Sequence, residues 1–233
     1  MTLPAINMPG KRNYLICFSG MDGAGKTTLA RRLAAEMDSK GFRTHYVMAR
    51  FESFQLLRPV RWVAKKTWLA GKKTDQSPEG VRTKRRLFGN RLAAAIWQNG
   101  LMTDYWFQLN YKVRWPRRRG RTVCADRYVY DTAVDLAADL DWPPAVLLRR
   151  LERLLRLAPR PDLVFLIDLP EETAYQRNLA KKDNLPLDYF RRRRGLFLTF
   201  TARPEVAVLD GAQAPEELYA RIVRELKARG ITL

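Results

Sequence analysis

Short apolar runs recur along the chain, and segments with a helical spacing of apolar residues lie between them. Each run is rich in aliphatic or aromatic side chains, which is typical of buried β-strands. The runs occupy residues 14–18, 44–48, 122–125, 163–167 and 206–209. Strands that alternate with helices predict an α/β fold: a parallel five-stranded sheet, flanked by helices, with its ligand site at the carboxyl ends of the strands.

Two helical segments are clear from their periodicity. One has leucines at helical spacing with arginines between them, which predicts a helix with one core-facing side and one solvent-facing side. The leucines are Leu147, Leu148, Leu151, Leu154 and Leu155, and the arginines are Arg149, Arg150, Arg153 and Arg156. Pro159 and Pro161 should end this helix before the fourth strand. A last helix is predicted over residues 215–229.

The composition fits one domain of this class. The chain has 233 residues, and its hydrophobic content of 46% is enough for a single α/β core. The N-terminus does not resemble a signal peptide, and no stretch approaches the roughly 18 apolar residues of a membrane span, so we expect a cytoplasmic protein. Cys17 and Cys124 lie in apolar runs and are predicted core residues. His45 is the only histidine, which disfavours a Ser-His or His-metal mechanism.

The first chemical motif follows the first strand directly and precedes a helical stretch. It reads Gly20-Met21-Asp22-Gly23-Ala24-Gly25-Lys26-Thr27, a P-loop in its strand, turn and helix context, and it predicts nucleoside triphosphate binding. Gly20 and Gly25 allow the backbone N–H groups to surround the β-phosphate. Lys26 can bridge the β- and γ-phosphates, and the Thr27 hydroxyl can ligate Mg²⁺. The predicted ATP-binding residues of this loop are Gly20, Gly23, Ala24, Gly25, Lys26, Thr27 and Thr28.

The second motif is Asp126-Arg127-Tyr128, at the end of the third apolar run. An aspartate in this position can hold Mg²⁺ or its waters, as the Walker-B carboxylate of P-loop enzymes does. The adjacent arginine can point at an acceptor phosphate or at the phosphoryl group in transfer. We therefore predict Thr27 and Asp126 as the metal site.

These motifs together resemble the thymidylate kinase family of nucleoside monophosphate kinases. The resemblance runs from about residue 12 to the C-terminus, excepting the middle of the chain. Its pieces are Phe18 to Thr28, Arg50 after the second strand, Asp126-Arg127-Tyr128, Pro161 to Pro170 with Glu171-Glu172, and Val208-Leu209-Asp210-Gly211. It implies a single P-loop kinase domain over residues 1–233 with a mobile lid at about 171–195.

The resemblance also implies roles for single residues. Asp22 would contact the acceptor or its sugar, and Arg50, Arg127 and Tyr128 would lie on the acceptor side. The backbone near Gly211 and Ala212 would meet the adenine of ATP. Lys26, Asp22 and Arg127 would be catalytic, together with a lid residue, because the P-loop has no arginine. Arg177 is the first choice, with Lys181 and Lys182 as neighbours and the run Arg191 to Arg194 as the alternative.

Three departures from the family pattern concern the acceptor. Family members usually carry Glu where Ser19 stands. They also carry a Glu-Pro-Gly-Gly run after the second strand, where this chain has Arg50-Phe51-Glu52-Ser53-Phe54. The arginine that reads the thymine base has no clear counterpart, since its expected position falls near Asp104-Tyr105 and Arg91 lies too far upstream.

The middle of the chain is a basic, tryptophan-rich segment, which we take as a helical insertion at about 51–121. It carries 17 Lys or Arg and 4 Asp or Glu, so it supplies 17 − 4 = +13 of the net charge of +19. It also contains Trp62, Trp68, Trp97, Trp106 and Trp115. Three interpretations fit this pattern: a solvated basic face over buried tryptophans, peripheral binding to an anionic membrane surface, and binding to nucleic acid.

Three functions therefore remain open at the level of sequence. The first is ATP- and Mg²⁺-dependent phosphoryl transfer to a small-molecule phosphate acceptor, a nucleoside monophosphate, with thymidylate as the first choice. The second keeps the kinase chemistry but uses a sugar or lipid head group at a membrane surface. The third is a nucleic-acid-binding ATPase module, which leaves Asp22, Arg50 and Arg127 without a role. Association into a homodimer is also left open.

Overall fold

The computed structural model describes residues 13–50, 103–179 and 185–233 and contains one five-stranded sheet. The strands are β1 (Leu15–Gly20), β2 (Thr44–Met48), β3 (Thr122–Asp126), β4 (Leu163–Asp168) and β5 (Val206–Asp210). Their order is β2-β3-β1-β4-β5, and every neighbouring pair is parallel. The predicted α/β fold is therefore confirmed, with β1 in the centre of the sheet.

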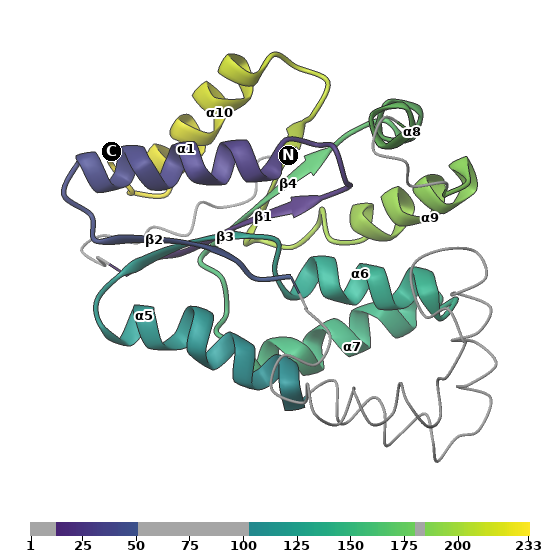
Figure 1. Cartoon of the computed structure of the whole chain (residues 1–233), viewed down its shortest axis with the longest axis horizontal. Coiled ribbons are helices and arrows are strands. Elements are labelled where there is room, and N and C mark those ends of the chain that lie inside the picture. The colour runs from purple at the N-terminus through teal and green to yellow at the C-terminus, as the bar shows by residue number, and fades with distance from the viewer. Residues whose placement is uncertain (1–12, 51–102, 180–184) are drawn as a thin grey trace.

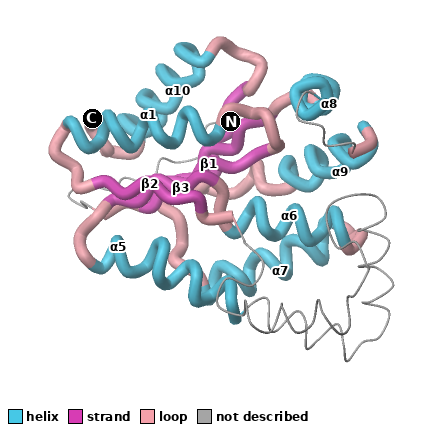
Figure 2. Tube along the Cα trace, viewed as in Figure 1, coloured by secondary structure: helices cyan, strands magenta, loops and turns pink. Residues whose placement is uncertain are grey.

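Helices cover both faces of the sheet, as Figures 1 and 2 show. On one face lie α1 (Lys26–Ser39) and α10 (Pro215–Ala228), and on the other lie α5 (Trp115–Arg118), α6 (Val129–Asp139) and α7 (Pro144–Leu157). Two helices, α8 (Glu171–Leu179) and α9 (Leu187–Leu198), follow β4 at the carboxyl edge of the sheet. Parallel strands joined by helical crossovers bring the carboxyl ends of all strands to this one edge.

Four of the five strands in this sheet, all except β2, extend further at their carboxyl ends than the apolar runs predict. The sequence places β1 at residues 14–18, but hydrogen bonding continues through Ser19 to Gly20. The third, fourth and fifth strands each gain a terminal aspartate, namely Asp126, Asp168 and Asp210. Each of these four apolar runs ends before the first polar or glycine residue. Hydrogen bonding between the strand backbones continues beyond it, because it does not depend on side-chain polarity. The residues that face a ligand are therefore the last residues of the strands.

The central strands form the buried core. Every residue of β1 and of β3 is buried, and Cys124 is the register partner of Ile16, beside Cys17 on the next strand. Both cysteines are free and buried, as predicted. Burial raises the pKa of the Cys124 thiol to about 12. Both thiols are thus protonated parts of the hydrophobic core.

The leucine stripe lies where its periodicity places it. Leu147, Leu151, Leu154 and Leu155 of α7 are buried, Leu148 is partly buried, and Arg149, Arg150, Arg153 and Arg156 are exposed. The helix ends at Leu157, two residues before Pro159. In the part of the chain that the structure describes, no helix is both long enough and apolar enough to cross a bilayer.

Only the end of the basic, tryptophan-rich segment is described. It forms a helix from residue 103 to Arg118 with a π-helical stretch, η1 (Asn110–Arg114), in the middle. Trp106 and Trp115 are partly exposed, and the Arg119 guanidinium carbon lies 4.0 Å from the centre of the Trp115 ring. Trp62, Trp68 and Trp97, with Arg91 and residues 51–54, lie outside the described residues, so the insertion at about 51–121 stays a prediction.

Candidate active site

The P-loop connects β1 to α1 at the centre of the carboxyl edge. Gly20 has a φ of 137°, and a Cβ placed there would lie 2.4 Å from the carbonyl oxygen of Ile167 in β4, so no larger residue fits. Gly25, with φ 82°, is the left-handed residue from which α1 begins. Both glycines are therefore required by the backbone path of the loop. Gly23, Ala24 and Thr28 lie on this same loop and first turn.

Lys26 is buried under the loop. Its ammonium group donates hydrogen bonds to the carbonyl oxygens of Gly20 at 2.8 Å and of Met21 at 2.6 Å. Burial, helped by the nearby Arg127, lowers the pKa of Lys26 to about 8. Because a phosphate carries negative charge, it is a stronger hydrogen-bond partner for this ammonium group than the two carbonyl oxygens are.

The two predicted metal ligands lie beside each other. The hydroxyl of Thr27 donates to Oδ2 of Asp126 at 2.5 Å, and the hydroxyl of Tyr46 donates to the same atom at 3.2 Å. The other carboxylate oxygen, Oδ1, is buried and has no hydrogen-bond partner. A carboxylate and a hydroxyl are the hard oxygen donors that Mg²⁺ prefers. The residues therefore fit Mg²⁺, and the unpartnered oxygen is the observation that supports this.

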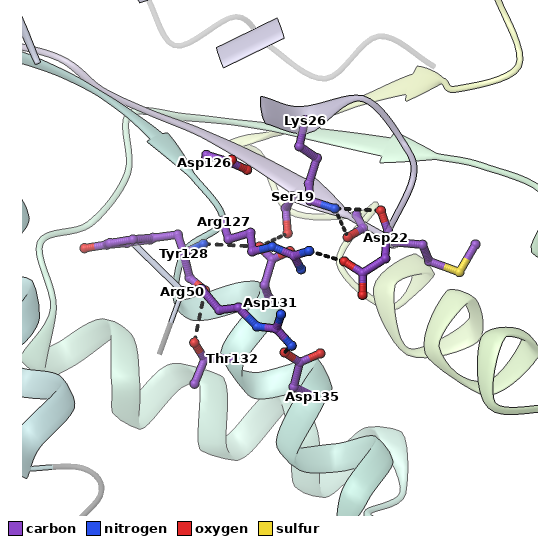
Figure 3. A network of polar contacts seen from close by, with 12 residues as sticks. Ser19, Asp22, Lys26, Arg50, Asp126, Arg127, Tyr128, Asp131, Thr132 and Asp135 are labelled. Carbon is purple, nitrogen blue, oxygen red and sulfur yellow. Dashed lines mark hydrogen bonds and ion pairs between the residues drawn. The ribbon is translucent and has the colours of Figure 1, made fainter. Parts of the chain in front are cut away.

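Asp22 and Arg127 form the centre of a charged cluster (Figure 3). A nitrogen of the Arg127 guanidinium donates to Oδ1 of Asp22. Burial alone would raise the pKa of Asp22, but Arg193, Arg127 and Lys26 together hold it well below its usual range. Arg127 itself has a φ of 66°, a left-handed conformation that costs about 1–2 kcal/mol in a residue other than glycine.

The second predicted acceptor-side arginine belongs to the same cluster. Arg50, after β2, lies with one guanidinium nitrogen 3.3 Å from Oδ2 of Asp135 in α6 (Figure 3). The structure thus brings together Asp22, Arg50 and Arg127, three residues far apart in the sequence. Both arginines are paired with carboxylates that a phosphate could replace.

Arg193 also belongs to this cluster, although the sequence indicates it only as one member of the run Arg191 to Arg194, and it does not indicate Asp135 at all. It is only 1% exposed, and its guanidinium joins Oδ2 of Asp22 at 3.0 Å to Oδ1 of Asp135 at 2.5 Å. The sequence predicts this run as the alternative source of the lid residue and does not predict that Arg193 is buried. A signal was nevertheless present, because Arg193 lies at helical spacing from Phe190 and Phe197, which are both buried in α9. Its pairing with Asp135 had no such signal.

Arg177 of α8, the first choice for the lid residue, lies against the P-loop. Its Nη1 donates to the carbonyl oxygen of Gly23 at 2.8 Å, and its Cβ is the nearest neighbour of a Cβ placed on Gly23. Arg194, by contrast, is bound at both Nε and Nη2 to Asp168, with Nη1 on Glu171, and so fastens α9 to β4 and α8. Lys181 and Lys182 lie outside the described residues.

Two predicted contacts have other partners in this structure. The Tyr128 side chain is fully buried, and its hydroxyl donates to the carbonyl oxygen of Pro159 at 2.7 Å, away from Asp22 and Arg50 (Figure 3). Tyr128 is thus not brought to the cluster. Gly211 is packed against β4, with its N–H donating to Asp168 O at 2.7 Å, and the N–H of Ala212 donates to the Asp210 carboxylate at 3.0 Å.

The site as a whole has two halves at one edge of the sheet. The P-loop with Lys26 and the pair Thr27 and Asp126 form one half, and the arginine and carboxylate cluster around Asp22 forms the other. A parallel sheet with these two halves at its carboxyl edge is typical of the P-loop kinase fold.

The curated relatives of this chain agree with that class. A thymidylate kinase of Xanthomonas euvesicatoria is 30% identical over 169 residues, which are 72% of this chain and 62% of the relative. One from Xanthomonas oryzae is 29% identical over 174 residues, with the same shares. A probable thymidylate kinase of Pyrococcus horikoshii is 26% identical over 225 residues, 93% of this chain and 97% of the relative. The chain is thus similar, over 72% to 93% of its length, to proteins named thymidylate kinase.

Two facts accompany these comparisons. The chain spans 62% of the length of the Xanthomonas relatives that it matches. No family model matches it.

Proposed function

We propose that the protein transfers the γ-phosphoryl group of ATP to a nucleoside monophosphate, with thymidylate as the preferred acceptor. The observation that carries the proposal is the cluster of Asp22, Arg50 and Arg127 beside the buried Lys26. It supplies cationic groups for an acceptor phosphate, and it adjoins the P-loop, which would bind the donor phosphates. The names of the relatives support thymidylate as the acceptor.

On the donor side, the loop N–H groups bind the β-phosphate and Lys26 moves from the carbonyl oxygens of Gly20 and Met21 to the β- and γ-phosphates. Thr27 and Asp126 would hold Mg²⁺, which supplies charge neutralisation on the phosphate oxygens when bound. Gly211 and Ala212 would border the adenine. Each of these roles uses a residue that already lies at the carboxyl edge of the sheet.

On the acceptor side, a phosphate replaces the carboxylates as partner of Arg50 and Arg127. Charge-assisted contacts of this kind fix both the position and the direction of the acceptor phosphate. Asp22, released from Arg127, is then free to accept a hydrogen bond from a hydroxyl of the acceptor's sugar. Catalysis in such a site comes from positioning and from neutralising charge, because phosphoryl transfer needs little covalent help from the protein.

The lid completes the charge balance. Phosphoryl transfer between two anions requires positive charge on the transferring group. Arg177 already contacts the carbonyl oxygen of Gly23 in the loop, so its guanidinium lies beside the loop that would bind the phosphates. We assign to Arg177 the role of neutralising the transferring group.

The test is an acceptor screen in which ADP release from ATP is measured with each nucleoside monophosphate in turn. We expect thymidylate to accelerate ADP release most, and chelation of Mg²⁺ to abolish the reaction. ATP without acceptor gives the background rate. If no nucleoside monophosphate raises ADP release above that background, the proposal is wrong.

A further inference from the structure

Asp131, one turn into α6, is a fully buried carboxylate that none of the roles above uses. Its Oδ2 accepts a hydrogen bond from the hydroxyl of Ser19 at 2.7 Å, across from the end of β1. The same atom accepts the backbone N–H of Tyr128 at 3.2 Å, which caps the first turn of the helix. Asp131 and Ser19 are 0% and 1% exposed. The carboxylate is therefore fixed in place from two sides.

The second oxygen of Asp131 is directed at Arg127. Oδ1 has no hydrogen-bond partner, and it lies 3.9 Å from Nη1 of Arg127, a buried atom that also has none (Figure 3). Two buried groups of opposite charge thus face each other just beyond hydrogen-bond distance. The helix cap uses only Oδ2, so it does not account for this arrangement.

The position of Asp131 differs from that of Asp22, the other carboxylate on Arg127. Asp22 belongs to the P-loop and is 20% exposed on its side chain, where it can turn to a ligand. Asp131 is fully buried where α6 meets the end of β1. Burial raises the pKa of Asp131, while Lys26 and Arg127 oppose the shift. The carboxylate and these two cations stabilise one another in a dry site, where an uncompensated charge would be costly.

We propose that Asp131 is a positioning residue: it is the fixed counter-charge that keeps Arg127 aimed at the acceptor phosphate when Asp22 turns from Arg127 to the acceptor. The geometry gives the two carboxylates different tasks, because only Asp22 can exchange partners. This inference rests on the proposed function for its catalytic consequence, and on Ser19, Arg127 and Asp131 alone for its structural one.

The first measurement needs no substrate. Urea unfolding is measured for the wild type, Asp131→Asn, Arg127→Ala and the double variant. The asparagine keeps an oxygen for Ser19 and Tyr128 but removes the charge. We expect the two changes to be coupled by about five- to tenfold in the equilibrium constant for unfolding, as for side chains in contact. Additive effects of the two changes would contradict the proposal, whatever the protein's substrate is.

The second measurement uses steady-state kinetics with ATP and thymidylate. We expect Asp131→Asn to lower kcat about tenfold and to raise KM for thymidylate, with KM for ATP unchanged. The matched control is Asp139→Asn, the same change at another buried position of the same helix, which should leave both constants within about twofold. Unchanged kinetics in folded Asp131→Asn would reduce Asp131 to a helix cap and overturn the proposal.

A transposed pair separates charge from side-chain shape. Asp131→Ser should lose more activity than Asp131→Asn, and Ser19→Glu with Asp131→Ser should recover most of the loss, because the carboxylate returns to the same place from β1. A folded double variant that is no more active than Asp131→Ser contradicts the proposal. If the wild type itself releases no ADP with thymidylate, the proposed function fails, while the unfolding measurements still decide the coupling.

Discussion

At the scale of single residues, the proposed function depends on arginines that would exchange carboxylate partners for phosphate. Arg50 and Arg127 are paired with Asp135 and Asp22, and Arg193 links those two carboxylates. A buried ion pair adds little net stability, but the loss of one member leaves an uncompensated charge. Residues that bind a ligand and residues that hold the cluster together can therefore be distinguished by experiment.

Arg50 belongs to the first kind. We expect Arg50→Ala to raise KM for the acceptor and to lower kcat, because a charge-assisted contact both binds and orients the phosphate. The constants for ATP should change little. Steady-state kinetics with each substrate varied in turn provides the measurement. A change confined to the ATP constants would place Arg50 on the donor side.

Arg193 belongs to the second kind. Arg193→Ala leaves Asp22 and Asp135 without their shared cation, so we expect a loss of about 3 kcal/mol in the free energy of unfolding. The matched control is Arg191→Ala on the same helix, whose side chain is 53% exposed and whose loss should cost under about 1 kcal/mol. Urea unfolding of both variants provides the comparison, and equal losses would refute the assignment.

Asp126 provides a third test at this scale. The asparagine variant keeps a hydrogen-bond acceptor for Thr27 but removes the charge that attracts Mg²⁺. We expect Asp126→Asn to need a higher Mg²⁺ concentration for half-maximal activity and to have a lower kcat. A titration of activity with Mg²⁺ measures this, and full activity at ordinary Mg²⁺ would make the carboxylate a structural residue only.

At the scale of elements, the two helices after β4 have different attachments. α9 packs on α6, where the buried Arg193 binds Asp135, and Arg194 joins α9 to Asp168 of β4. α8 meets the P-loop through Arg177, an exposed side chain. Within the predicted lid at 171–195, α9 is therefore packed on α6, whereas α8 has the basic side chain that contacts the P-loop. The lid itself stays a prediction.

Arg177 carries the mechanistic claim for this element. We expect Arg177→Ala to lower kcat by about a hundredfold with little change in the KM for ATP, since the guanidinium acts on the charge of the transferring group. Gln176→Ala, an exposed neighbour on α8, is the control and should retain its activity. An unchanged kcat in Arg177→Ala would transfer the role to the arginines of α9.

At the scale of the whole molecule, the sequence predicts what depends on local pattern. The apolar runs located all five strands, and the glycine spacing located the P-loop, because both are properties of neighbouring residues. The pairing of Ser19 with Asp131, or of Arg193 with Asp22 and Asp135, depends on how α6 packs against β1 and how α9 packs against α6. These contacts join residues that lie 58 to 171 positions apart in the sequence, and no local pattern specifies them.

The same reasoning explains the one acceptor-side residue that was placed differently. Tyr128 adjoins Arg127 in the sequence, but the left-handed backbone of Arg127 turns the chain, and the Tyr128 side chain enters the core toward Pro159. Adjacency in a motif therefore does not imply a shared direction. The structure keeps Asp126 and Arg127 at the edge of the sheet and buries the third residue of the motif.

The central claim is that the P-loop uses Lys26 to transfer phosphate from ATP to a nucleoside monophosphate. Lys26→Ala removes the positive charge at the γ-phosphate but no contact of the hydrophobic core. The most direct test is therefore thymidylate-dependent ADP release by this variant, with circular dichroism as the check of its fold. We predict a loss of at least about a hundredfold in turnover. Turnover within about tenfold of the wild type, in a folded variant, would contradict the account.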